Sequence, residues 1–477
     1  MLGAAVAGVL LAAQPAPAGD VFVIAMENHN FTQPNPTNSP QQILGNPAAP
    51  FLNSLVTPGH PNAAQVSFAL AYANAGMHVH PSEPNYVWAE AGTDFGVHTD
   101  ADPRAANGNT FYDQAIHFAA LLNAAGIPWR NYQEDVELSA SPTNSASGTN
   151  APAPNPYYGT TQYNYAVKHN PMAFFSDTAA QNVYPLAQLF VDLASHHLGR
   201  YNWITPNQYN DAHSSLNGGF TYQGTHYPGD QSSIAQGDNF LATVIPQIMA
   251  SPAYQDNGLI VIWWDESEDG DDATHTIPEI ILSPLAKDDA YASAVPMNHS
   301  SDLKTLAEIF RLPALNNPIP ATETNTDGGY NNVATVNDLS DLFVPGAIPA
   351  PPELTVTRGP LMPDRRSKQI RQLVRITNTG TSPVAAPLFL ALDNLSVNAM
   401  LLNADGSTTV LAPLGSPYVN VRIDGEDGDQ EDGNSDHTDR IRLLRPHESA
   451  TVLLKFLDPS GQAITYDTRT LSATPTP

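Results

Sequence analysis

Residues 21–28 read Val-Phe-Val-Ile-Ala-Met-Glu-Asn, and residues 259–266 read Leu-Ile-Val-Ile-Trp-Trp-Asp-Glu. Both are continuous apolar runs that end abruptly in acidic or amide side chains. A continuous apolar run is typical of a strand buried on both faces of a parallel sheet. In open sheets of this kind, ligand-binding side chains follow the carboxyl ends of the strands. The two stretches therefore predict an α/β fold with a mostly parallel sheet and a polar site at one edge.

Working outward, residues 20–345 alternate strand-like apolar runs with helical stretches. The expected strands are Val21–Met26, Tyr201–Thr205, Leu259–Trp264 and Glu279–Leu282. The expected helices are Thr110–Ala125, Val183–His196, Ser232–Ala250 and Ser300–Phe310. Such alternation predicts a sheet sandwiched by helices on both faces, so we expect a catalytic domain over residues 20–345.

The pattern changes after residue 345. Residues 346–352 are rich in proline and predict a stiff linker, and residues 353–472 carry short strands separated by turns. About seven such strands predict a small all-β domain, an immunoglobulin-like sandwich whose partner the sequence leaves open. Within it, residues 424–439 are dense in acidic side chains and glycine. This run is either a calcium site without EF-hand spacing or a solvated acidic hairpin.

The charge of the chain limits its partners. The 477 residues hold 19 Lys+Arg against 47 Asp+Glu, a net charge of −28, and no cysteine. This balance argues against nucleic acid or an anionic membrane as the partner, because both need cations on the protein. An anionic substrate would be repelled unless a bound cation reverses the local field. The acidity therefore favours a metal site.

The amino-terminal residues predict export. Residues 1–19 combine an apolar run with an Ala-Pro-Ala sequence, which is typical of a signal peptide, although an ordinary apolar helix is the alternative. The run is too short and too interrupted by proline to span a bilayer. We expect a secreted, periplasmic or extracellular protein without a transmembrane segment.

A hydroxyl lies between the two acidic strand ends. Residues 80–86 read His-Pro-Ser-Glu-Pro-Asn-Tyr, which we interpret as a turn bounded by proline that presents Ser82. A hydroxyl, carboxylates at two strand ends and several histidines are the groups needed for metal-assisted phosphoryl or sulfuryl transfer. Two alternatives remain open: Ser82 as a helix N-cap, and Thr93 as the reactive hydroxyl.

Several further motifs, taken in order along the chain, point to one family. They are Met26–Phe31, Pro81–Tyr86, Ala91–Gly96, Trp129–Asp135, Tyr165–Pro171, Ile204–His213, Trp264–Glu266 and Asn298–Ser300. Over residues 21–313 the chain resembles the phosphoesterase family of acid phosphatases and phospholipases C, within the alkaline-phosphatase superfamily.

The resemblance implies roles for particular residues. The implied metal ligands are Glu27, Asn28, Ser82, Asp265 and Glu266, with Asp211, His213 and His275 available for a second ion, so a site with one or two divalent cations is expected. The implied catalytic residues are Ser82 as nucleophile, Asn85, His169 and His299. The implied substrate-binding residues are Asn85, His169, Asn170 and His213.

These observations predict a secreted, metal-dependent phosphoesterase that hydrolyses phosphomonoesters through a phosphoseryl intermediate. A phospholipase C acting on phosphodiester lipids is one alternative, for which residues 172–175, Met-Ala-Phe-Phe, would serve as an apolar loop. A non-catalytic surface binding protein is the other. The expected substrate is a small-molecule or lipid phosphoester.

Overall fold

The protein is described here from a computed structural model. The described residues are 18–32, 42–74, 79–101, 116–136, 165–267, 276–315, 317, 333, 336–349, 353–364, 366, 369–380, 384–385, 387–408, 415–423 and 443–471. The expected signal peptide, apart from its last two residues, the ligand candidate His275 and the acidic run 424–439 lie outside them.

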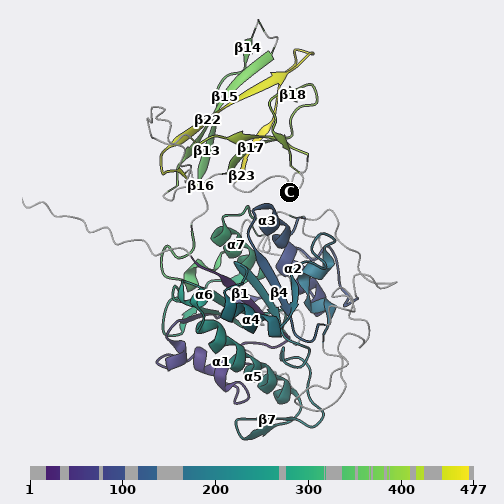
Figure 1. Ribbon diagram of the computed structural model, residues 1–477, viewed down its shortest axis with the longest axis vertical. Helices are drawn as coiled ribbons and strands as arrows, with labels where there is room; N and C mark the ends of the chain where they lie inside the picture. The colour runs from purple at the N-terminus through teal and green to yellow at the C-terminus, as the bar shows by residue number, and fades with distance from the viewer. Residues whose placement is uncertain are drawn as a thin grey trace, which may run out of the picture.

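A mixed sheet of eight strands forms the centre of the α/β part, in the order β11-β2-β10-β9-β1-β6-β4-β5 (Figure 1). The strands are β1 Val21–Met26, β2 Val66–Ala69, β4 Trp129–Gln133, β5 Val183–Pro185, β6 Tyr201–Thr205, β9 Leu259–Trp264, β10 Glu279–Leu282 and β11 Tyr291–Ser293. Only β10 runs against its neighbours β9 and β2. The prediction of a mostly parallel sheet is therefore confirmed, and the four predicted strands have the expected bounds.

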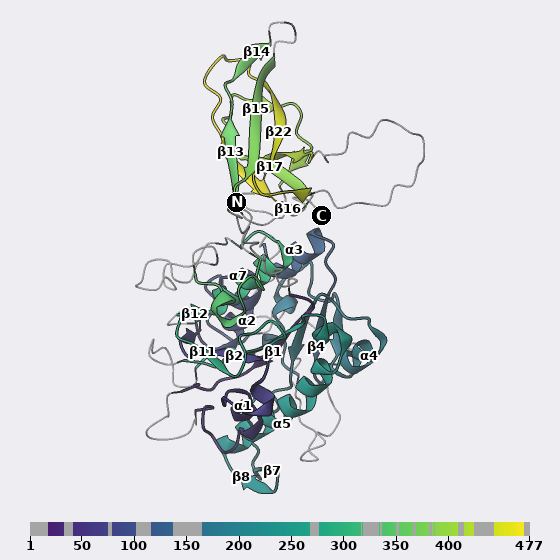
Figure 2. The same cartoon turned by 90° about the vertical axis from the view of Figure 1, so that its left-hand side faces the viewer.

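Helices cover both faces of this sheet. They are α1 Pro50–Leu55, α2 Ser82–Ala91, α3 Phe118–Ala124, α4 Ala187–Ser195, α5 Asp230–Met249, α6 Pro252–Gln255 and α7 His299–Phe310. Helices α2, α3 and α7 lie on one side, and α1, α4 and α5 on the other (Figures 1 and 2). Short 3-10 turns occur at Pro61–Ala63, Val167–His169, Pro171–Phe174 and Leu339–Leu342.

One predicted helix needs correction at its start. Residues 183–185 of the expected helix 183–196 form the edge strand β5 instead. Val183 and Tyr184 favour a strand, and Pro185 is tolerated at a sheet edge, where no partner requires its missing N–H. The described part of the expected helix Thr110–Ala125 is shorter, beginning at residue 118.

The carboxy-terminal part is rich in β-strands. One sheet has the order β13-β15-β22-β18, with β14 also paired to β15, and another has the order β19-β20-β17-β23. Its strands are β13 Leu354–Arg358, β14 Met362–Asp364, β15 Gln369–Asn378, β16 Val384–Ala385, β17 Leu388–Asp393, β18 Met400–Leu401, β19 Gly406–Ser407, β20 Pro417–Val421, β21 Leu443–Leu444, β22 Ser449–Leu457 and β23 Asp467–Leu471. The immunoglobulin-like topology stays a prediction.

Two small strand pairs complete the α/β part: β3 Tyr72–Ala73 with β12 Met297–Asn298, and β7 Phe220–Tyr222 with β8 Thr225–Tyr227. Most buried apolar side chains of the carboxy-terminal part pack together in a core of their own. Four of its residues instead join the core of the α/β part, namely Phe389, Ala391, Tyr418 and Leu471. No helix in the described ranges is both long and apolar enough to cross a membrane.

Candidate active site

Two strand ends bring the first carboxylates together. Strands β1 and β9 are parallel and pair Met26 with Trp264, so Glu27 and Asp265 leave the sheet side by side. The backbone N–H of Asn28 donates to Asp265 Oδ1 over 2.9 Å, and Asn28 Nδ2 donates to Glu266 Oε1 over 3.0 Å. Asn28 has a φ of 23°, a conformation that asparagine tolerates better than most residues. The polar side chains that follow both strands therefore lie together at one edge of the sheet.

Helix α2 delivers the hydroxyl. Ser82 is its first residue, and Ser82 Oγ donates to Glu27 Oε2 over 2.9 Å and lies 3.4 Å from Glu266 Oε1. The N-cap position belongs to Pro81, so Ser82 does not cap the helix with its side chain. Thr93 lies beyond the other end of α2, where its Oγ1 accepts from the N–H of Phe95. The geometry therefore favours Ser82 over Thr93 as the reactive hydroxyl.

Two histidines and another carboxylate surround Glu27 on its remaining side. His169 Nε2 lies 2.9 Å from Glu27 Oε1, and His169 Nδ1 lies 3.5 Å from Asp211 Oδ2. His213 Nδ1 lies 3.2 Å from Glu27 Oε2. Tyr86 stacks on the ring of His169 at 4.9 Å between centroids, which fixes the orientation of that ring. The loop from Asp211 to His213 is anchored to the strand end, because Glu27 N donates to Asp211 O over 2.8 Å.

Burial and mutual charge set the protonation of the group. Burial would raise the pKa of Glu27, but the neighbouring His169 and His213 hold that pKa well below its usual range. Burial and the charge of Glu27 raise the pKa values of Asp211 and Asp265 well above theirs. Burial would lower the pKa of His213, yet Glu27 and Asp211 raise it to about 9. Several carboxyl groups thus compete for ionisation in one buried place, an arrangement common at functional sites.

The donor set fits a hard divalent cation. Within the described part of the chain, Glu27, His169 and Asp211 each offer an atom within 4.8 Å of the others. Two buried oxygens there, Asn28 Oδ1 and Asp265 Oδ2, have no hydrogen-bond partner, and Glu27 Oε1 and Asp211 Oδ2 face only the ring nitrogens of His169. Buried carboxylate oxygens left without donors are costly unless a cation satisfies them. Carboxylate, amide and imidazole groups suit a divalent metal, so Glu27, Asn28, Asp211 and Asp265 would hold it.

Comparison with known proteins shows the family to which the chain belongs. The model of the Phosphoesterase family matches residues 56–313, which is more than half of the chain. The chain belongs to this family. The resemblance predicted from the motifs is confirmed, and so is the assignment to the phosphoric ester hydrolases.

Named relatives agree with the family. The chain is 28% identical over 309 residues to phosphatidylinositol-3-phosphatase of Mycobacterium tuberculosis, covering 65% of this chain and 83% of that protein. It is 34% identical over 142 residues to an acid phosphatase of Aspergillus fumigatus, covering 28% of each. It is 25% identical over 212 residues to a phosphate-repressible acid phosphatase of Penicillium chrysogenum, covering 43% of this chain and 42% of that protein. The chain thus spans less than half of either fungal relative.

A solved structure is similar only at a low level. A Vibrio parahaemolyticus protein of the alkaline phosphatase superfamily shares 10% identity and a TM-score of 0.39, over 76% of this chain and 78% of that one. A score this low supports no argument about function.

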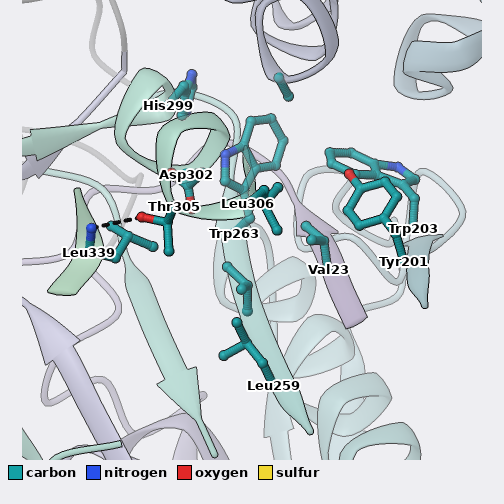
Figure 3. A pocket seen from close by; sticks show the side chains of 12 residues that line it. Val23, Tyr201, Trp203, Leu259, Trp263, His299, Asp302, Thr305, Leu306 and Leu339 are labelled. Carbon is teal, nitrogen blue, oxygen red and sulfur yellow. Dashed lines mark hydrogen bonds between the residues drawn. The ribbon is translucent and has the colours of Figure 1, made fainter. Parts of the chain in front are cut away.

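Some of the residues predicted for the site have other partners in the structure. His299 is fully buried, and its Nε2 lies 2.9 Å from the carbonyl oxygen of Trp264. Burial lowers its pKa to about 3, so it is neutral and poorly suited to the catalytic role predicted for it. Its ring borders a small cavity of about 20 Å³ under α7, together with Trp263 and Asp302 (Figure 3). His299 therefore packs α7 against the sheet.

The two asparagines predicted to bind substrate, Asn85 and Asn170, have partners within the protein. Asn170 accepts from Asn131 and donates to the hydroxyl of Tyr165, so its amide supports the turn that carries His169. Asn85 Nδ2 donates to the carbonyl of Val79 over 2.8 Å and to Glu266 Oε2 over 3.2 Å. Its amide donors thus hold Glu266 in place, where the sequence predicted contacts to the phosphoryl group.

The sequence reasoning missed several residues at the site. His80 is not among the predicted site residues, yet its Nδ1 lies 2.5 Å from Glu266 Oε2. Its position two residues before Ser82 was the available signal. Lys168, which precedes His169, and Asp100 were also not singled out. Conversely, Met172, Phe174 and Phe175 of the suggested lipid loop are fully buried and do not offer an apolar surface.

Proposed function

We propose that this phosphoesterase is an exported, metal-dependent phosphomonoesterase that transfers the phosphoryl group to Ser82. The observation that carries the proposal is the position of Ser82 Oγ, 2.9 Å from Glu27 Oε2 and 3.4 Å from Glu266 Oε1. A hydroxyl beside buried carboxylates from two strand ends has the arrangement needed for a nucleophile next to a cation.

The cation, when bound, would neutralise the charge of the phosphoryl group and increase the acidity of the hydroxyl. The residues of the chain would supply the nucleophile and accept its proton. Ser82 Oγ attacks phosphorus, the bond to the leaving alcohol breaks, and phosphoserine forms. The hydroxyl proton is already directed at Glu27 Oε2. Water then hydrolyses the phosphoserine, giving inorganic phosphate and restoring the Ser82 hydroxyl.

The histidines suit proton transfer to the leaving oxygen. His213 is 38% exposed and so is accessible to substrate, while His169 is 1% exposed and held by Tyr86. We therefore assign the exposed His213 to the leaving-group oxygen and His169 to the orientation of Glu27. A general acid near the leaving group contributes roughly 100-fold to 10,000-fold in rate.

A phosphomonoester is favoured over a phosphodiester lipid. The relatives described above are named phosphatases, and the suggested lipid loop at residues 172–175 is buried. The phosphomonoester substrate can be either a small molecule or a lipid. A non-catalytic binding role is disfavoured, because the nucleophile and carboxylates are all retained in one cluster.

The discriminating experiment compares hydrolysis of p-nitrophenyl phosphate and p-nitrophenylphosphorylcholine, each with and without a chelator. We expect turnover of the monoester, abolished by chelation and restored by a divalent metal. Faster turnover of the choline diester would favour the phospholipase C alternative. Turnover of neither ester after reconstitution with each of Mg²⁺, Ca²⁺, Mn²⁺ and Zn²⁺ would favour a binding protein.

A further inference from the structure

A lysine lies at the edge of the catalytic cluster. Lys168 belongs to the 3-10 turn Val167–His169 and immediately precedes His169, which lies 2.9 Å from Glu27. Its side chain is 15% exposed, and Lys168 Nζ donates to Asp100 Oδ2 over 3.0 Å. The ammonium group is therefore held at the rim of the site while still reaching solvent.

The partner of this lysine also contacts the nucleophile helix. Asp100 Oδ1 accepts from the backbone N–H of Glu83 over 3.1 Å, and Glu83 follows Ser82 in the first turn of α2. One carboxylate thus bridges an ammonium group and a backbone N–H beside the reacting hydroxyl. These two kinds of donor are also those that bind phosphoryl oxygens in proteins.

The positive charge of Lys168 is surrounded by carboxylates. Burial would lower its pKa, but Glu27, Asp100 and Asp265 together raise it, so the ammonium stays charged. Several other cations of the described α/β part are engaged elsewhere: Arg130 with Asp192, Arg200 with Asp20, and Lys287 with Asp341. An ammonium group has three donors, and Asp100 takes one of them.

We infer that Lys168 is a substrate-binding residue that contacts a non-bridging oxygen of a phosphomonoester, and that Asp100 is the counter-ion this oxygen displaces. The inference rests on the proposed function and adds the basis of its substrate preference. A phosphomonoester dianion carries more charge on its non-bridging oxygens than a phosphodiester monoanion. Lys168 therefore favours the dianion, and Asp100 competes with it.

The test compares Lys168→Gln with Asp100→Asn. For each variant, kcat/KM is measured with p-nitrophenyl phosphate and with bis(p-nitrophenyl) phosphate, and binding of inorganic phosphate is measured by calorimetry on the metal-loaded protein. Lys168→Gln should lower kcat/KM for the monoester about tenfold or more and weaken phosphate binding similarly, because a charged hydrogen bond is lost. The diester should lose less than about threefold, since it carries less charge.

Asp100→Asn should act in the opposite direction. Its amide oxygen still accepts from Glu83 N, while the competing charge is gone, so the monoester KM should fall and phosphate should bind more tightly. Lys168→Arg should keep most of the monoester preference. Equal losses on both substrates for Lys168→Gln, or weaker phosphate binding in Asp100→Asn, would overturn the inference. If the wild type hydrolyses neither ester, the proposed function fails, and phosphate binding alone then decides the role of Lys168.

Discussion

At the scale of single residues, Glu27 is a fully buried carboxylate whose side-chain neighbours come from three separate segments. Ser82, His169 and His213 all lie within 3.2 Å of its two oxygens. Burial of such a carboxylate costs free energy unless its charge is compensated. The histidines compensate part of it, and the unpartnered oxygens around it indicate that a cation supplies the remainder.

Asp265→Asn tests this compensation. The substitution keeps an oxygen to accept from Asn28 N and removes one charge from the donor set. We expect the metal content after dialysis to fall well below that of the wild type, and kcat/KM to fall more than about 100-fold. Loss of a residue that only supports a metal ligand already lowers metal affinity or activity by about 10- to 100-fold, and loss of a ligand itself should cost at least as much. Elemental analysis and initial rates measure both. The exposed Glu353→Gln is the control, and wild-type metal content in Asp265→Asn would contradict the ligand assignment.

Much of the cluster could be predicted from strand ends alone. Glu27, Asn28, Asp265 and Glu266 directly follow continuous apolar runs, so their shared position follows from parallel pairing. Lys168, Asp100 and His80 could not be found in this way. Their places depend on loop conformations that bring together residues far apart in sequence.

At the scale of elements, helix α5 packs tightly against the loop that carries Asp211 and His213. A Cβ on Gly237 would lie 2.7 Å from the Cβ of Ala212 and 3.0 Å from Met26 Cε. Gly237→Ala should therefore shift Ala212, whose φ is already 82°, and with it both neighbouring side chains. We expect metal affinity to fall roughly tenfold to 100-fold, although alanine favours helices. Metal titration measures this effect, and Gln247→Ala on the exposed face of α5 should show none.

Strand β10 and helix α7 each contribute one buried acidic side chain, Glu279 and Asp302, and the two are electrostatically coupled. Burial and then the charge of Asp302 raise the pKa of Glu279, and burial raises the pKa of Asp302 to about 7 despite its bonds to Tyr72 and Glu279. Raised acid pKa values mean that the folded state binds protons more tightly. Stability is therefore greatest below the unfolded pKa and falls as pH rises through about 7.

Glu279→Gln should flatten this dependence, because the amide donates to Asp302 without carrying charge. Between pH 6 and 8 we expect the wild type to lose about 1–2 kcal/mol more of its free energy of unfolding than the variant. Urea unfolding at each pH measures the difference, with the exposed Glu353→Gln as control. Parallel pH profiles for wild type and Glu279→Gln would refute the coupling between Glu279 and Asp302.

The elements differed in how readily the sequence predicted them. The four central strands were predicted with their observed bounds, because burial on both faces leaves an uninterrupted apolar run. Helix α2 was interpreted as a turn, because Pro81 and Pro84 flank its start. Proline is compatible with the first turn of a helix, where a backbone N–H would have no intrahelical partner.

At the scale of the whole molecule, the carboxy-terminal part shares apolar packing with the α/β part. Phe389, Ala391, Tyr418 and Leu471 belong to the larger core, although no residue of the described site lies beyond residue 345. A chain ending at residue 349 should keep kcat for p-nitrophenyl phosphate within about threefold and should unfold at a lower temperature, since apolar surface is exposed. Rates and thermal unfolding check this. A folded but inactive truncation would show that the carboxy-terminal part supports the chemistry.

The most direct test of the account is a rapid acid quench with a ³²P-labelled phosphomonoester, followed by peptide mapping. Ser82 is the hydroxyl placed against Glu27 and Glu266, so the label should appear on the peptide that contains Ser82. In Ser82→Ala the label should be absent and the rate should fall by several orders of magnitude, while the metal stays bound. Label on Thr93, or a near-normal rate in Ser82→Ala without any trapped phosphoenzyme, would contradict the account.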